Sequence, residues 1–177
     1  MSQIDANVVE AEQLAEDFRQ AMRRLVATVT IITAGDATVR AGMVATAVMS
    51  VSAHPPSLAI GVNRDTGVWQ AATASGRFCV NLLSTVHTEL VHPFSGHVQG
   101  EERFHVGQWG LHRSAVSYLE DAVVSLFCRV DGSLDYGTHT VFIGAVEEVR
   151  FSQNENEPLL WRNGSFANAV PLEELLD

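Results

Sequence analysis

The sequence predicts a mainly β fold: a mostly antiparallel β-barrel with an N-terminal helix and short helices packed outside it. Two observations support this prediction. Short β-branched and apolar runs outnumber the helical segments along the 177 residues, and few connections are long enough for a crossover between parallel strands. A parallel Rossmann sheet is the weaker interpretation, because no Gly-x-Gly-x-x-Gly motif follows a strand and the alternation of strands and helices is poor.

The first half of the chain predicts one helix followed by strands. Apolar residues recur at helical spacing over 11–25, which predicts an amphipathic N-terminal helix. Its apolar face consists of Leu14, Phe18, Met22 and Leu25. Strands are predicted at 26–34, as one or two strands within 37–52, and at 57–63. Gly35 and Asp36 form a turn signal, and strand pairing must stop at Pro55 and Pro56 because proline lacks the N–H that a ladder needs.

The second half alternates short helices with strands. Residues 65–76 predict a short helix that Asp65 or Thr66 caps and Gly76 ends. A second short helix within 85–96 should stop near Pro93. The other predicted segments are a strand at 77–84, irregular chain at 96–118, two long strands within 122–151 joined around Gly132 to Gly137, and a last short strand and turn at 158–169. The length fits a single domain over 1–177, with terminal arms at 1–14 and 168–177.

Composition and charge exclude several classes of protein. The net charge of −10 disfavours nucleic acid and anionic membranes as partners. No apolar run approaches the ~18 residues of a membrane span, and the acidic N-terminus does not read as a secretory signal, so we expect a cytoplasmic protein. All 11 basic residues are Arg, which excludes a Lys Schiff base and a Lys-containing P-loop. An anionic ligand must therefore be held by hydroxyls, backbone N–H groups and arginine.

Cysteine and histidine usage indicates neither a disulfide nor a metal site. Cys79 and Cys128 lie in apolar runs and are expected to be small buried side chains in a reducing compartment. The seven His are scattered, and the chain has no Cys-x-x-Cys or His-x-x-x-His pair, so no metal is predicted. The chain also lacks the Gly-x-Ser-x-Gly elbow of serine hydrolases and the paired carboxylates of glycosidases.

Small hydroxyl side chains are concentrated in "MVATAVMSVSAHPPSLAIGVN", residues 43–63. In a continuous strand they would share one uncharged face. The members of that face are Val44, Thr46, Val48, Ser50 and Ser52. The stretch leads into "VNRDTG", where Asn63, Arg64 and the start of the next helix could converge on a phosphate group. The alternative is a polar outer face with a solvated Arg64 and an ordinary helix cap, and residue types alone favour this alternative.

The order of six segments resembles the short-chain flavin reductase family. The segments are "GMVATAVMSVSAHPP", "VNRDTGVW", "SGRFCVNLLS", "FSG…ERF", "YGTHTVFIGAVEEV" and "PLLWRNGSF", and they span roughly residues 15–167. The resemblance implies a split β-barrel related to FMN-binding proteins, usually a homodimer with its flavin site near the subunit interface. It also implies hydride transfer from NADH or NADPH to FMN or FAD, and a partner monooxygenase that uses the reduced flavin.

The resemblance further implies which residues bind the flavin. They are Thr46, Ala47, Val48, Ser50, Val51, Ser52, Asn63, Arg64, Thr66 and Asn81. Residues 46–48 would run beside the isoalloxazine ring, residues 50–52 would contact the ribityl chain and phosphate, and residues 63–66 would complete the phosphate end. Asn81 would lie near the flavin.

Two further positions concern the nicotinamide side of the implied site. His139 matches a family histidine on that side, and Phe166 matches a C-terminal aromatic position near the pocket. Without the resemblance, a lone histidine at the start of an apolar strand is more often a surface or structural residue. The chain departs from the family at Val44, often Thr, and at Asp65, often Ser or Thr, which bears on the phosphate contacts and on FMN versus FAD.

The preferred functional hypothesis is an NAD(P)H:flavin oxidoreductase. Hydride transfer between two stacked rings is a positioning task that needs no nucleophile, so a sparse set of catalytic groups fits it. The sequence has no cluster of Arg residues that could bind the 2′-phosphate of NADPH, which favours NADH. The alternative is a non-catalytic FMN-binding or electron-carrier protein on the same barrel. A relative of pyridoxamine-phosphate oxidase is a third hypothesis, but no basic cluster suits that substrate.

Overall fold

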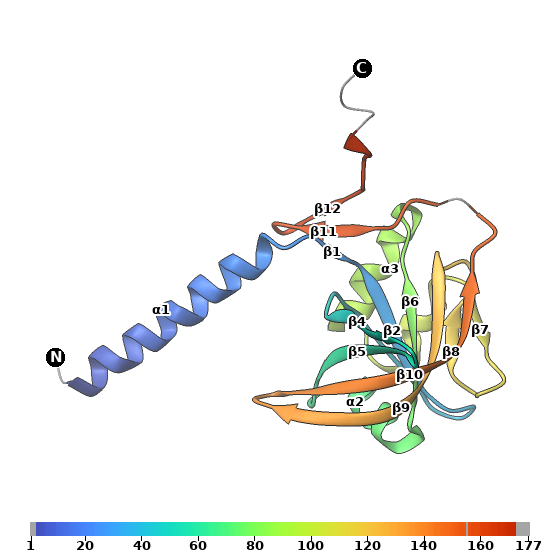
Figure 1. The fold of residues 1–177 in the computed structure, drawn as a ribbon, viewed down its shortest axis with the longest axis horizontal. Coiled ribbons are helices and arrows are strands. Elements are labelled where there is room, and N and C mark those ends of the chain that lie inside the picture. Colours follow the sequence, from blue (N-terminus) through green and yellow to red (C-terminus); the bar gives the residue numbers. More distant parts are fainter. Residues whose placement is uncertain (1–2, 155, 173–177) are drawn as a thin grey trace.

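A seven-stranded antiparallel sheet forms the body of the computed structural model, which describes residues 3–154 and 156–172 (Figure 1). Its strands, in spatial order, are β3 (Arg40–Ala45), β2 (Thr30–Gly35), β6 (Arg77–Leu82), β9 (Val124–Tyr136), β10 (His139–Phe151), β5 (Pro56–Asn63) and β4 (Val48–Ala53). The two edge strands, β3 and β4, are consecutive in the chain and separated only by Thr46 and Ala47. The sheet must therefore curl until its edges approach one another at this corner, although no ladder joins β3 to β4 in the part of the chain described. The mainly antiparallel β fold with an N-terminal helix is confirmed.

Smaller elements surround this sheet. A second sheet, in the order β1-β11-β12, is formed by β1 (Ala27–Thr28), β11 (Leu160–Arg162) and β12 (Ser165–Ala167), and a separate hairpin by β7 (Trp109–Leu111) and β8 (Ser117–Leu119). The helices of the body are α2 (Gly67–Ser75) and α3 (Thr88–His92), and short helical turns occupy Thr85–His87, Pro93–His97 and Gly100–His105. The prediction of irregular chain at 96–118 was wrong, because its strands are only three residues long and leave little periodic signal.

The core lies on both faces of the sheet. Along β2 every residue is buried, although successive side chains point to opposite faces. Ile32 packs with Val68 and Ala72 of α2, whereas Ile31 packs with Leu90 of α3 in a second cluster. Each fully buried aliphatic side chain stabilises the fold by about 1.5–3 kcal/mol, so α2 and α3 are held on opposite sides of β2.

The boundaries of two predicted elements need correction. The second short helix was expected to stop near Pro93; α3 does end at His92, but a wide helical turn continues to His97. The long strands were expected to join around Gly132 to Gly137. Instead β9 continues through Gly132, which lies opposite Ile143, and the turn is at Gly137 and Thr138. The chain reverses at the second of two candidate glycines, and His139 becomes the first residue of β10.

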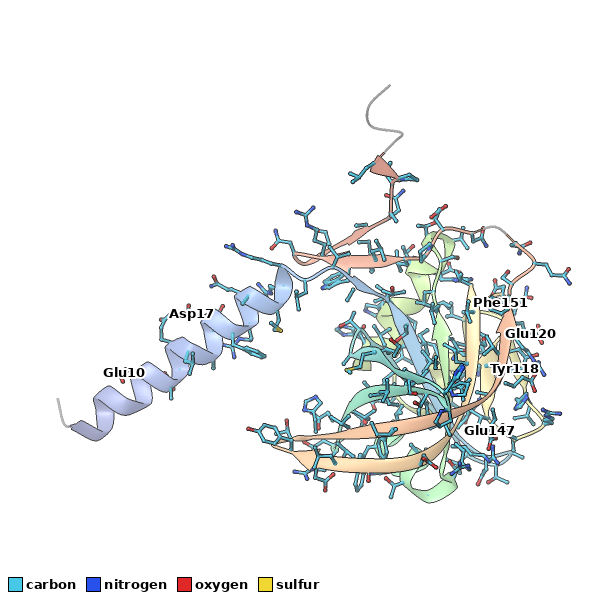
Figure 2. The ribbon with its side chains drawn as sticks, in the orientation of Figure 1. Glu10, Asp17, Tyr118, Glu120, Glu147 and Phe151 are labelled. Atoms are coloured by element: carbon cyan, nitrogen blue, oxygen red, sulfur yellow. The ribbon has the colours of Figure 1, made fainter. Side chains whose placement is uncertain are left out.

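The N-terminal helix α1 (Gln3–Arg23) projects from the body (Figure 1). It starts earlier than the predicted range of 11–25. Its predicted apolar face is uncovered in the single chain, since Leu14 is 70% exposed and Phe18 61%. Figure 2 shows Glu10 and Asp17 on this helix, apart from the body. In proteins most helical stability comes from the packing of an amphipathic face, and the described chain leaves this face of α1 largely exposed.

An ion-paired cluster attaches the β7–β8 hairpin to the main sheet. Glu148 of β10 accepts a hydrogen bond from Arg150 Nε at 2.8 Å, and its other oxygen lies 3.0 Å from Nε2 of the buried His112. The hydrogen bond from Arg150, followed by that from His112, lowers the pKa of Glu148 to about 2. His112 also stacks on Phe127, with ring centroids 3.9 Å apart. The connection between β7 and β8 is thereby fixed to β9 and β10.

Both cysteines are free and buried, as predicted. Burial raises the pKa of the Cys79 thiol well above its ordinary value, and it raises that of Cys128 to about 12. Neither thiol is therefore ionised near neutral pH. Among the helices described here, none combines the length and apolar character needed to cross a bilayer.

Candidate functional site

The pairing of β5 with β10 brings several predicted site residues together. Asn63, the last residue of β5, lies directly opposite His139, the first residue of β10. The backbone N–H of Arg64 donates to Thr138 O at 3.0 Å, which continues this contact into the turn of the β9–β10 hairpin. The side chain of His139 is exposed, and its Nδ1 lies 2.9 Å from Thr138 Oγ1. Residues some 75 positions apart in the chain thus become neighbours at one end of the sheet.

The turn from β5 into α2 is ordered by its own side chains. Asn63 Oδ1 accepts a hydrogen bond from Asp65 N at 2.9 Å, and Thr66 Oγ1 donates to Asn63 O at 2.7 Å. Thr66 Oγ1 also accepts from Trp69 N at 3.2 Å, so Thr66, and not Asp65, caps α2. Gly76 ends the helix in a left-handed conformation, as predicted. The N-terminus of α2, with its partial positive charge, therefore starts beside Arg64.

Arg64 carries the positive charge of this cluster. Its Nη1 lies 3.3 Å from Asp135 Oδ2, and its Nη2 donates a hydrogen bond to Gly137 O. The Arg64 side chain is 38% exposed, so it remains accessible to a ligand. Within the described residues, no group of three or more His, Cys, Asp or Glu side chains is arranged to hold a metal ion.

A cavity of about 800 Å³ opens beside this cluster. Its walls are β3, α2 and the segment 94–103, and its lining includes Arg40, Gly42, Thr66, Phe94 and Arg103. This volume lies within the range of small-molecule sites, about 300–1,000 Å³. Of the predicted site residues, only Thr66 lines the cavity. The sequence signal that could have indicated the cavity is the "FSG…ERF" segment, which supplies Phe94 and Arg103.

Arg103 fixes one wall of the cavity to the sheet. Its guanidinium donates to Gly42 O of β3 and to Val98 O at 2.8 Å. Burial lowers the pKa of Arg103, and its Nε is buried without a partner among the described residues. Gly42 is required for close contact, since a Cβ there would lie 2.6 Å from Phe94 Cε1. The segment 94–103 is thereby held against β3.

The predicted face of small hydroxyls required a continuous strand over residues 44–52, and the structure does not have one. The stretch 43–63 divides into β3, β4 and β5, with Thr46 and Ala47 in the connection before β4. Gly61 N donates to Ala47 O at 3.0 Å, and Val48 pairs with Ile60, which places 46–48 near the Asn63 end of β5. The predicted single face of hydroxyls is therefore interrupted at the connection.

The second part of β4 lies away from Arg64. Ser50 pairs with Leu58 and Ser52 with Ser57, and the register shifts between them at Val51. At about 3.3 Å per residue, Ser50 and Ser52 lie roughly 16–20 Å along the strands from the Asn63 end. Within one chain, residues 50–52 are therefore too far from Arg64 to contact the same phosphate, and that prediction is wrong. These side chains are exposed.

The prediction that Asn81 binds the flavin also requires correction. The Asn81 side chain is fully buried; Nδ2 donates to Ile31 O at 2.9 Å, and Oδ1 accepts from Leu119 N at 2.9 Å. Further bonds join it to Thr33 and Ser125. Because the amide has no exposed surface, it cannot contact a cofactor, and its role is to join β2, β8 and β9 through the core.

Phe166 lies outside the cluster in a single chain. It belongs to β12, where its ring contacts Trp161 at a centroid distance of 5.2 Å. Figure 1 shows β12 well apart from the turn between β9 and β10, where His139 lies. Phe166 and His139 of one chain therefore do not face the same ligand.

Comparison with known proteins identifies relatives over most of the chain. Residues 22–169 match the family described as flavin reductase like domain. The chain is 40% identical to FMN reductase (NADH) RutF from Agrobacterium fabrum, covering 86% of this chain and 87% of that protein. It is 41% identical to the reductase component of a FADH(2)-dependent resorcinol hydroxylase from Rhizobium sp., covering 93% of both chains. Among solved structures, the NADH:FAD oxidoreductase SgcE6 from Streptomyces globisporus superimposes with a TM-score of 0.80 at 28% identity, covering 87% of this chain and 92% of that one.

Proposed function

Because the chain belongs to the flavin reductase like family, we propose that it oxidises NADH and transfers the hydride to FMN or FAD, releasing reduced flavin to a partner monooxygenase. In the balanced reaction, NADH and a proton convert oxidised flavin to its two-electron-reduced form and leave NAD⁺. The names of the relatives support both the NADH dependence and the role as a reductase component.

One observation carries this proposal at the level of the site. Thr66 belongs both to the wall of the 800 Å³ cavity and to the turn that holds Arg64 beside His139. The cavity and the Arg64 cluster are thus neighbours that meet at Thr66, the N-cap of α2. This arrangement suits a ligand that joins an aromatic ring system to a phosphorylated chain, as flavins and nicotinamide nucleotides do.

The residues of the chain would then bind and orient the two reactants. Bound flavin supplies the ring nitrogen that accepts the hydride. Arg64 and the backbone N–H groups at the start of α2 hold phosphate, and Arg103 holds one wall of the cavity in place. The exposed imidazole of His139 offers a hydrogen bond to the nicotinamide nucleotide. No side chain is required as a nucleophile, because bringing the two rings together supplies most of the catalysis.

The decisive assay follows NADH oxidation at 340 nm with and without added flavin. We expect steady turnover that increases with free FMN or FAD, and slower turnover with NADPH. A yellow protein whose absorbance NADH does not bleach would instead select a non-catalytic flavin carrier. The assay is best run as a matrix of NADH and NADPH against FMN, FAD and riboflavin.

The same proposal includes a homodimer in the cytoplasm. The apolar face of α1, with Leu14 and Phe18, is largely exposed in the described part of the chain, and Met49 and Val51 of the edge strand β4 are 64% and 48% exposed. A second copy is the occupant we propose for these surfaces, because burial in a reciprocal interface would remove both from water. If Phe166 contacts the ligand, it must come from that second copy. Free buried thiols fit a reducing compartment.

Light scattering at micromolar concentration tests the dimer. We expect about twice the chain mass of 19.2 kDa for the wild type, and the chain mass for a Leu14→Asp, Phe18→Asp double variant. A wild-type monomer that reduces flavin at the full rate would contradict the proposed assembly.

A further inference from the structure

The carboxylate of Asp135 lies beside Arg64, the residue that we propose binds the flavin phosphate. Asp135 Oδ2 lies 3.3 Å from Arg64 Nη1. Both groups are partly exposed, at 61% for Asp135 and 38% for Arg64. Exposed pairs of this kind contribute little to stability, about 0–1 kcal/mol, so folding alone gives no strong reason for the pair. Its position at the ligand site suggests a role in binding.

The Asp135 carboxylate is held in place from the protein interior. Its other oxygen, Oδ1, accepts a hydrogen bond of 2.6 Å from Thr140 Oγ1, and Thr140 is directly opposite Asp135 in the β9–β10 ladder. Thr140 is 2% exposed, and its Oγ1 accepts in turn from Trp69 Nε1 at 2.9 Å. The chain of contacts from α2 to Asp135 keeps the negative charge fixed next to Arg64.

Arg64 retains donors for a ligand in spite of these contacts. A guanidinium has five N–H donors. In the described part of the chain, Arg64 directs Nη1 to Asp135 and Nη2 to Gly137 O, and its Nε–H donates to no protein acceptor. A phosphate can therefore approach Arg64 without displacing Asp135, but it must then lie near a fixed carboxylate.

We propose that Asp135 is a specificity-determining residue that weakens the binding of phosphorylated flavins through charge repulsion. The proposal rests on the proposed function, in which Arg64 holds the flavin phosphate. A reductase that supplies a separate oxygenase must release its product, and a fixed negative charge beside the phosphate site favours release. Riboflavin, which has no phosphate, is unaffected by this charge.

The size of the effect follows from the exposure of the site. A phosphate bound to Arg64 would lie about 5–6 Å from the Asp135 carboxylate, in surroundings close to bulk water in dielectric constant. Screening at physiological salt reduces the repulsion further. We therefore expect a change of about three- to tenfold in the affinity for FMN when the Asp135 charge is removed.

The experiment measures flavin dissociation constants by fluorescence quenching for the full-length protein. Asp135→Asn should bind FMN about three- to tenfold more tightly than the wild type, with riboflavin affinity unchanged, and the gain should shrink at high salt. Asp135→Glu, which keeps the charge, should behave like the wild type. Asp131→Asn is the matched control: Asp131 is also on β9, is similarly exposed, and pairs with Arg129 at 2.9 Å instead of with Arg64. It should leave FMN affinity unchanged.

Two further measurements separate the possible failures. Arg64→Ala should weaken FMN binding about ten- to a hundredfold and riboflavin binding much less. If Arg64→Ala is selective for FMN but Asp135→Asn does not tighten FMN binding, the role of Asp135 is refuted while the phosphate site stands. If Asp135→Asn shifts FMN and riboflavin equally, or if Asp131→Asn tightens FMN binding as much as Asp135→Asn does, the role of Asp135 is also refuted. The proposed function is tested independently, because NADH oxidation with riboflavin needs no phosphate.

Discussion

Replacing Asn81 with alanine should destabilise the protein without specifically affecting flavin binding. The buried amide joins Ile31 O, Leu119 N, Thr33 Oγ1 and Ser125 Oγ. Alanine cannot replace these bonds, and it leaves at least the Ile31 carbonyl and the Leu119 N–H short of a partner in a fully buried site. A lost partner for a buried polar group costs about 1–3 kcal/mol.

Two such groups and the small cavity left by the amide sum to about 3–5 kcal/mol. This is a large part of the ordinary stability of a domain, about 5–15 kcal/mol. For a chain of this size, 1 kcal/mol corresponds to roughly 2–4 °C in Tm, so we expect a decrease of roughly 6–20 °C. Urea unfolding should show a lower midpoint with an unchanged slope.

The assay compares Asn81→Ala with Asn168→Ala, an exposed asparagine outside the sheets. Thermal and urea unfolding measure stability, and flavin dissociation constants are measured at a temperature where both variants are folded. Asn168→Ala should match the wild type in both measurements. If Asn81→Ala keeps its Tm but loses flavin affinity, Asn81 contacts the cofactor and our assignment of a purely structural role is refuted.

Three further perturbations test other parts of the structure. His139→Ala should lower kcat/KM for NADH about five- to thirtyfold and leave flavin affinity within a fewfold of wild type, while unchanged kinetics with a lower Tm would make His139 structural. Gly42→Ala should lower the free energy of unfolding in urea by about 1–3 kcal/mol, because the new Cβ would lie 2.6 Å from the Phe94 ring. Gly67→Ala should be tolerated, because its Cβ would lie 3.7 Å from the nearest atom. Equal effects of the two variants would contradict this reasoning. Glu148 has its pKa lowered from 4.5 to about 2 by its hydrogen bond from Arg150, so its stabilisation is present above pH 4.5 and is lost as the pH falls toward 2. Over that range the Tm of wild type should fall faster than that of Glu148→Gln, and parallel curves would argue against the assignment.

Local signals predicted the elements that depend on local chemistry. The helix α2 was found from its caps, because Thr66 and Gly76 act on backbone groups within a few residues of themselves. The predicted turn between β9 and β10 covered Gly132 to Gly137, because both glycines are compatible with a reversal and only the pairing of two long strands decides between them. The β7–β8 hairpin was missed because its strands are too short to show a period.

The site depends on contacts that spacing in the chain does not reveal. Asn63 meets His139 through strand register, and Arg103 reaches the carbonyl of Gly42 across 61 positions. The resemblance named His139 and Arg64 as candidates, but it could not show that Ser52 lies at the other end of β5. Nor could the apolar pattern of Leu14 and its neighbours indicate that α1 would leave the body of its own chain.

The burial of both thiols has a consequence for survival under oxidative conditions. Reduced flavin that escapes into aerobic solution reacts with dioxygen and yields hydrogen peroxide, so a protein with the proposed activity works near a source of oxidant. Peroxide attacks thiolates, and the raised pKa values of Cys79 and Cys128 keep both sulfurs protonated and enclosed. Both sulfurs lie in the core, at 0% and 2% exposure. Oxidation of either thiol should therefore require the sheet to open, so a folded enzyme that produces reduced flavin keeps its cysteines intact.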